Sequence, residues 1–124
     1  MERLGISEIA CKNFQTLSVG ERQMVFFGLA LAQQAEYLIL DEPTAALDFS
    51  NQVRVLGTVR RLTREGYGIL MTTHFPGHAF LACSRAVLLG DGHVLEDGPP
   101  EKAVTSESLT KLCHVPVCVT QAVL

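Results

Sequence analysis

Two adjacent carboxylates, Asp41 and Glu42, directly follow four apolar residues, Tyr37 to Leu40, and Pro43 ends the run. An unbroken apolar run of this length predicts a strand that is buried on both faces, as in a parallel sheet. Ligands in open α/β sheets bind beyond the carboxyl ends of the strands, where these two acids lie. Such acids are costly to desolvate unless a cation or a proton-sharing ligand meets them. Because successive strand residues point to opposite sides, one acid can face a hydrated Mg²⁺ and the other an attacking water.

The simpler interpretation of the two acids is a buried strand followed by the start of a helix, where carboxylates are common. A second candidate site lies upstream, where Ser18 precedes an apolar-rich segment and Glu21 follows three residues later. This spacing is a capping box, which predicts a helix that begins here and continues through Gln33. The free N–H groups of its first turn can bind an anion, and Gly20 would let a phosphate approach the backbone closely. The motif alone is also consistent with a well-capped core helix.

The third candidate is His74, which follows a short apolar run over residues 68–73 that predicts a second buried strand. It lies at the carboxyl end of that strand, at the edge where the two acids are expected. There it could donate to a phosphate oxygen or help to orient a water. A purely structural histidine is an alternative. A metal shared with His78 is another, but the proline and glycine between the two histidines argue against the uninterrupted helix that such a site needs.

The elements that must position these residues follow an α/β pattern. Apolar residues at helical spacing predict an amphipathic helix over residues 49–65 that ends at Gly66. A short helix over residues 77–83 follows. Asp91-Gly92 between two short apolar runs predicts a β-hairpin. A helical tail near residues 101–104 and 108–113 precedes the final extended segment.

The composition excludes several classes of protein. The chain has 124 residues, enough for one compact domain, and its net charge of −3 gives no footprint for nucleic acid. No apolar run approaches the roughly 18–20 residues of a membrane span. The four cysteines form no CxxC pair. A metal site at Cys113, His114 and Cys118 would lack a fourth ligand at suitable spacing.

Three motifs, taken together and in order, resemble those of the ATP-binding subunits of ABC transporters. LSVGERQ at residues 17–23 resembles the family's signature motif. YLILDEPTAALD at residues 37–48 resembles its Walker B and D-loop segment, and MTTH at residues 71–74 resembles its H-switch. The resemblance extends from about residue 14 to residue 119. It implies an α/β fold, a partial P-loop NTPase (RecA-like) domain of the ABC type in which helices flank a parallel sheet.

The resemblance also implies roles for single residues. Asp41 would hold Mg²⁺ through water, Glu42 would polarise the hydrolytic water, and His74 would sense the γ-phosphate of ATP. Asp48, in the D-loop, would lie at the dimer interface beside the nucleotide. Four signature residues would bind ATP held by a second subunit: Leu17, Ser18, Gly20 and Glu21. The sequence departs from the family at Val19, where glycine is usual, and a β-branched residue there restricts the backbone near the phosphate.

No GxxxxGK[ST] phosphate loop occurs in the 124 residues, although P-loop enzymes use its Lys and its Ser/Thr for the phosphates and Mg²⁺. We therefore expect the carboxyl half of a nucleotide-binding domain, lacking the Walker A half. In this division, residues 1–33 are the end of the helical subdomain and the signature helix, 34–98 the catalytic core strands, and 99–124 a helical tail. We expect this piece alone to be inactive towards MgATP and to have unpaired sheet edges and exposed apolar surface.

The function that the resemblance implies is ATP hydrolysis in an ABC importer, most similar to those for metal chelates of the iron–siderophore, haem or cobalamin type. Its partners would be ATP, a second nucleotide-binding subunit and transmembrane permease subunits, without nucleic acid. Its location would be cytoplasmic, on the inner face of the cell membrane. Two alternatives remain: a non-catalytic remnant or interaction fragment, and an ABC ATPase of the DNA-repair or chromosome type. ATPases of the latter type carry long coiled coils, and this sequence has no heptad run.

Overall fold

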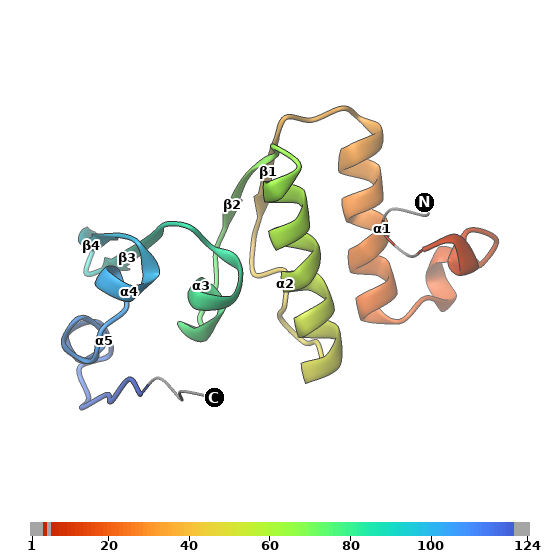
Figure 1. The fold of residues 1–124 in the computed structure, drawn as a ribbon. Coiled ribbons are helices and arrows are strands. Elements are labelled where there is room, and N and C mark those ends of the chain that lie inside the picture. The colour runs from red at the N-terminus through yellow and green to blue at the C-terminus, as the bar shows by residue number, and fades with distance from the viewer. Residues whose placement is uncertain (1–3, 5, 121–124) are drawn as a thin grey trace. The chain divides into compact units, whose positions relative to one another are not determined.

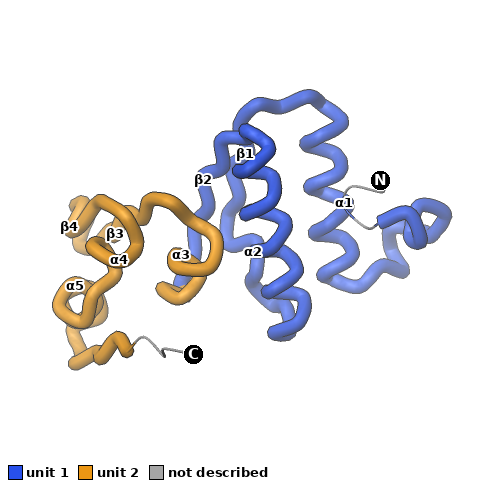
Figure 2. The backbone as a smooth tube through the Cα atoms, in the orientation of Figure 1, with its two compact units in different colours: residues 1–74 blue, residues 75–124 orange. Residues whose placement is uncertain are grey.

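The computed structural model of the chain describes residue 4 and residues 6–120 (Figure 1). The chain folds as two compact units, residues 1–74 and residues 75–124 (Figure 2). Among the described residues, no helix combines the length and the apolar character needed to cross a bilayer.

The first unit is built on a βαβ motif. Two short 3₁₀ turns, η2 (Ser7–Ile9) and η3 (Phe14–Thr16), lead into helix α1 (Val19–Ala32). Strands β1 (Tyr37–Leu40) and β2 (Gly68–Met71) pair in parallel, and helix α2 (Phe49–Arg64) connects them. A crossover helix is the usual connection between parallel strands. The predicted boundaries of both helices are confirmed to within one or two residues.

Helices α1 and α2 pack side by side and form most of the core of this unit (Figure 1). The buried apolar residues of α1 are Met24 and Phe27, and α2 contributes Val55, Leu56, Val59 and Leu62. The Thr58 hydroxyl is also buried and lies 3.9 Å from the Met24 sulfur. The polar face of α2 carries its arginines, as the sequence pattern predicts.

The prediction that both strands are buried on both faces is wrong. Tyr37 and Ile39 of β1 are 78% and 79% exposed, and Leu70 of β2 is 65% exposed. The register pairs Tyr37 with Gly68 and Ile39 with Leu70, so these side chains share one face of the sheet. Leu38 points to the other face and is buried. The apolar run is typical of a strand that is covered on both faces, but no described element covers the outer face here. The two-stranded sheet also has unpaired edges.

In the second unit, the described residues form an antiparallel hairpin with three helices. Helix α3 (Gly77–Ala82) precedes strands β3 (Ala86–Gly90) and β4 (His93–Gly98), and helices α4 (Pro100–Ala103) and α5 (Ser106–Cys113) follow. The predicted turn is confirmed, because Asp91 and Gly92 both have positive φ, 51° and 76°. The core of this unit consists of Ala79, Leu88, Ala103, Val104 and Leu109. The final extended segment is held to α5 by a bond from the Val119 N–H to Ser106 Oγ, at 2.8 Å.

Candidate functional site

The parallel register brings the chemically active side chains to one edge of the β1–β2 sheet. Leu40 and Met71 are the last paired residues of the two strands, and the Thr72 N–H still donates to the Leu40 carbonyl at 2.9 Å. The residues that follow each strand therefore leave the sheet at the same carboxyl edge. This places Asp41 and Glu42 on one side and His74 on the other, as the sequence predicts.

Thr72 links the two acids. Its hydroxyl donates to Asp41 Oδ1 at 2.6 Å and accepts the Glu42 N–H at 3.0 Å. One hydroxyl thus fixes the carboxylate of one acid and the backbone of the next. No role for Thr72 was predicted from the sequence. The contact of Thr72 with Asp41 could have been predicted, because in a parallel pair the residue after β2 lies opposite the residue after β1.

Glu42 and His74 lie in direct contact, with 2.5 Å between Glu42 Oε1 and His74 Nε2. Glu42 has a φ of 43°, which is uncommon for a residue other than glycine. The turn that follows is closed by a bond from the Ala45 N–H to the Glu42 carbonyl at 2.9 Å, and Thr44 inside it is buried. A carboxylate beside an imidazole can act as a general base, with the imidazole as a hydrogen-bond donor.

The capping box at the start of α1 is confirmed. Ser18 Oγ accepts the Glu21 N–H at 3.2 Å, and Glu21 Oε2 accepts the Ser18 N–H at 2.8 Å. This bond to the Ser18 backbone, together with Lys12 at 2.9 Å, lowers the pKa of Glu21 from 4.5 to about 2. The N–H groups of Val19 and Gly20 have no acceptor within the described part of the chain. They are the donors that a helix start offers to an anion.

The other predicted nucleotide contacts have structural duties. The Leu17 side chain is buried, and the Leu17 backbone carbonyl accepts a hydrogen bond from Arg22 Nε at 3.1 Å. Together these contacts anchor the start of α1. Asp48 is the N-cap of α2 and accepts the Asn51 N–H at 3.4 Å, and Asn51 lowers its pKa through a side-chain hydrogen bond. No hydrogen bond or ion pair among the described residues joins the signature segment to the Asp41 edge.

The residues at the sheet edge fit Mg²⁺ in a limited sense. Mg²⁺ keeps several waters and is commonly held by one or two carboxylates together with substrate phosphates. Asp41 is exposed, and only its Oδ1 is bonded to Thr72, which leaves Oδ2 for a cation or its water. The described residues contain no group of three or more His, Cys, Asp or Glu side chains that could hold a metal by themselves. His78 is buried, its ring lies 5.2 Å from the Phe75 ring between centroids, and burial lowers its pKa.

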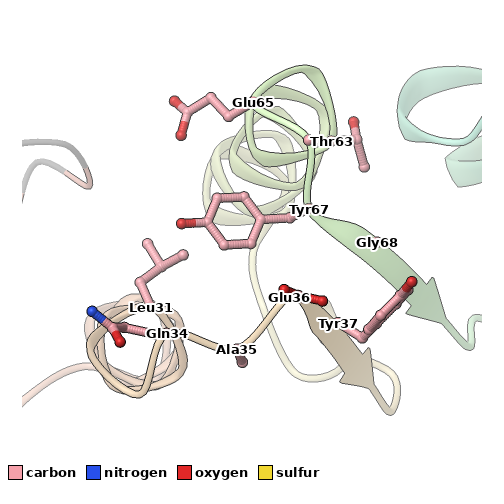
Figure 3. A pocket seen from close by; sticks show the side chains of 10 residues that line it. Leu31, Gln34, Ala35, Glu36, Tyr37, Thr63, Glu65, Tyr67 and Gly68 are labelled. Atoms are coloured by element: carbon pink, nitrogen blue, oxygen red, sulfur yellow. The ribbon is translucent and has the colours of Figure 1, made fainter.

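A pocket of the first unit lies at the opposite end of the strands (Figure 3). It has a volume of about 810 Å³ and lies between the ends of the two helices and the first strand residues, with Leu31, Glu36, Tyr37 and Tyr67 among its lining. The Tyr37 ring covers Gly68, where an added Cβ would come within 2.5 Å of the ring. This pocket contains none of the predicted site residues.

Both the sequence and the fold match proteins of one family. A model of the family described as ABC transporter matches residues 1–45, which include the signature and the Asp41-Glu42 pair. The chain is 39% identical to the hemin import ATP-binding protein of Deinococcus radiodurans over 98% of its length. This chain is a homologue of ABC transporter ATP-binding proteins. It is also 34% identical to the ferric enterobactin transport ATP-binding protein of Escherichia coli, over 90% of the chain.

Solved ABC structures share the fold of the chain. A structure described as a metal-chelate type ABC transporter in an inward-facing conformation matches with a TM-score of 0.93 and 33% identity, over 98% of this chain. The protein cbiO1 of Clostridium perfringens, part of the cbiONQ complex, matches with a TM-score of 0.78 and 27% identity. The predicted ABC-type α/β fold is thereby confirmed. The chain spans only 48% of the hemin import protein and 42% of the enterobactin protein.

Proposed function

We propose that this chain supplies the signature and the hydrolytic residues of an ATP-binding subunit in an ABC importer for metal chelates. The observation that carries the proposal is the sheet edge, where Thr72 holds Asp41 and Glu42 together and Glu42 contacts His74. The hemin and enterobactin proteins support a metal-chelate cargo, because the names of these relatives refer to iron compounds.

At this edge each residue has one task. Asp41 would hold Mg²⁺ through water, and the ion would supply positive charge that offsets the charge of the phosphates. Glu42 orients the attacking water and accepts its proton. His74 donates a hydrogen bond to a γ-phosphate oxygen, where negative charge must be stabilised. The exposure of both side chains, 41% for Glu42 and 80% for His74, leaves them accessible to a nucleotide.

The signature segment acts on a second nucleotide. The free N–H groups of Val19 and Gly20, with the Ser18 hydroxyl, would bind the γ-phosphate of ATP held by a second nucleotide-binding subunit. Leu17 and Glu21 serve that site indirectly, because they fix the start of α1. Asp48 would lie beside the same dimer interface. The remaining partners would be permease subunits, with the assembly on the cytoplasmic face of the membrane.

The proposal requires a phosphate loop from outside these 124 residues, whose sequence contains no GxxxxGK[ST] motif. In this view residues 1–33 carry the signature helix, residues 34–98 the core strands and residues 99–124 the tail of one nucleotide-binding domain. The rival is a non-catalytic remnant. The two differ in whether the edge hydrolyses ATP once a phosphate loop is provided.

A chimera tests this difference. The chain is fused to the part of the Deinococcus hemin import protein that it does not match, and ATP hydrolysis is measured. We expect Mg²⁺-dependent hydrolysis by the chimera and none by the 124-residue chain alone. A chimera that is folded and binds ATP, yet shows no hydrolysis, would favour the remnant.

A further inference from the structure

A single side chain, Asn51 in the first turn of α2, touches both the signature helix and the D-loop. On its side facing α1, it lies against Gly20, the second residue of that helix. On its other side it bonds Asp48, the last residue of the D-loop segment. We propose that Asn51 is a positioning residue that sets the Gly20 backbone and the Asp48 carboxylate at a fixed spacing. The consequence for phosphate binding rests on the function proposed above.

The contact with Gly20 explains why this position lacks a side chain. A Cβ built on Gly20 would lie 2.7 Å from Asn51 Oδ1 and 2.8 Å from Asn51 Cγ, closer than real Cβ atoms come to neighbours. The three nearest atoms all belong to Asn51. A side chain at position 20 would therefore require the Asn51 amide to move, so Gly20 and Asn51 are matched to each other at this contact.

The bonds to Asp48 fix the orientation of the Asn51 amide. Its Nδ2 donates to Asp48 Oδ1, and its backbone N–H donates to Asp48 Oδ2 at 3.4 Å. An ionised carboxylate only accepts hydrogen bonds, so the amide nitrogen must face Asp48. The amide oxygen is then the atom nearest to Gly20. Neither end of the amide can move without changing a contact at the other.

This arrangement joins two segments that the proposed function uses separately. The N–H groups of Val19 and Gly20 are the anion donors, and Asp48 closes the D-loop. Further along α2 than Asn51, buried side chains pack the two helices against each other, including the contact of Thr58 with Met24. The interhelical packing therefore sets the general spacing, and Asn51 sets the local spacing at the phosphate-binding end.

A double-mutant cycle tests the proposal on the 124-residue chain. Gly20→Ala should lower the melting temperature by several degrees, because the new methyl group meets Asn51. Asn51→Ala removes the obstacle, so the double variant should lose less than the sum of the two single losses. Additive losses would overturn the proposal, because they would mean that the two residues act independently.

An NMR comparison keeps the proposal testable if Gly20→Ala does not fold. Asn51→Ala should shift the Gly20 amide resonance and raise the pKa of the Asp48 carboxyl. The matched control is Gln52→Ala, which removes a neighbouring amide that bonds the Leu47 carbonyl at 3.0 Å and should leave Gly20 unshifted. A Gly20 resonance that does not respond to Asn51→Ala would contradict the proposal. These readouts need no ATP, so they stand even if the chimera proves inactive.

Discussion

Glu42 and His74 contact each other at the carboxyl edge of the β1–β2 sheet, with 2.5 Å between the carboxylate oxygen and the imidazole nitrogen. The His74 side chain is 80% exposed and the Glu42 side chain 41% exposed, so the contact between them contributes little to stability. Glu42 also has a φ of 43°, a conformation that costs free energy in residues other than glycine. An exposed pair on a strained turn is poorly explained by folding, and this favours a chemical role.

Replacing Glu42 with glutamine should separate binding from hydrolysis. In the chimera, Glu42→Gln keeps the shape of the side chain but removes the base that accepts the proton of water. We expect ATP affinity to remain and the turnover number to fall by about 10²–10⁴-fold. Measurements of both quantities on the same preparation check this. Turnover that persists at the original rate would remove Glu42 from its proposed role.

Thr72 should matter through its hydroxyl. Thr72→Val keeps the volume of the side chain but loses the bonds to Asp41 and to the Glu42 backbone. We expect turnover in the chimera to fall by about 10²-fold, as for small misplacements of catalytic groups, with a higher Mg²⁺ requirement. Thr72→Ser is the matched control and should stay close to the original activity. Equal losses in both variants would show that the methyl group, not the hydroxyl, matters.

Two valines of α2 offer a matched test of the core. Val59 is 2% exposed and Val53 is 48% exposed, and both lie on the same helix. Val59→Ala should lower the free energy of unfolding by about 2 kcal/mol, because it removes buried methyl groups and leaves a cavity. Val53→Ala should change it by less than about 0.5 kcal/mol. Chemical denaturation of the two variants checks the difference, and equal effects would contradict the described packing of α1 against α2.

The capping box predicts that the stability of the chain depends on pH in the acidic range. The pKa of Glu21 is lowered from 4.5 to about 2, first by its bond to the Ser18 backbone and then by Lys12. Because the folded pKa lies below the unfolded one, the stabilisation is complete above about pH 4.5 and is lost as the pH falls through about 2. An NMR titration of the Glu21 carboxyl measures this directly. Glu21→Gln should remove this part of the acid sensitivity, and a midpoint near 4.5 in the original chain would contradict the box.

The features that the sequence predicted correctly depend on residues close together in the chain. The capping box of Ser18 and Glu21, the end of α2 before Gly66, and the turn at Asp91-Gly92 each follow from the preferences of a few neighbouring residues. The meeting of the two acids with His74 also followed, because parallel strands must end at the same edge.

The features that the sequence analysis missed depend on residues far apart in the chain. Thr72 acts on Asp41, 31 residues away, and only the register of two strands shows it. Gly20 was interpreted as a place for phosphate, and its contact with Asn51 depends on how two helices pack. The burial of Ile39 was predicted from an apolar run. Such a run shows that the side chain is apolar, but it does not show whether another element packs against it.

The exposed face of the sheet should cause self-association of the isolated chain. Ile39 and Leu70 are paired in register and are 79% and 65% exposed, beside unpaired strand edges. Apolar strands of this kind favour pairing with other chains. Replacing both residues with lysine should shift the chain towards monomer in analytical ultracentrifugation. Leu29→Lys, on an exposed position of α1 at 55%, is the control and should shift it less. A chain that is already a clean monomer at high concentration would show that the open face does not drive association.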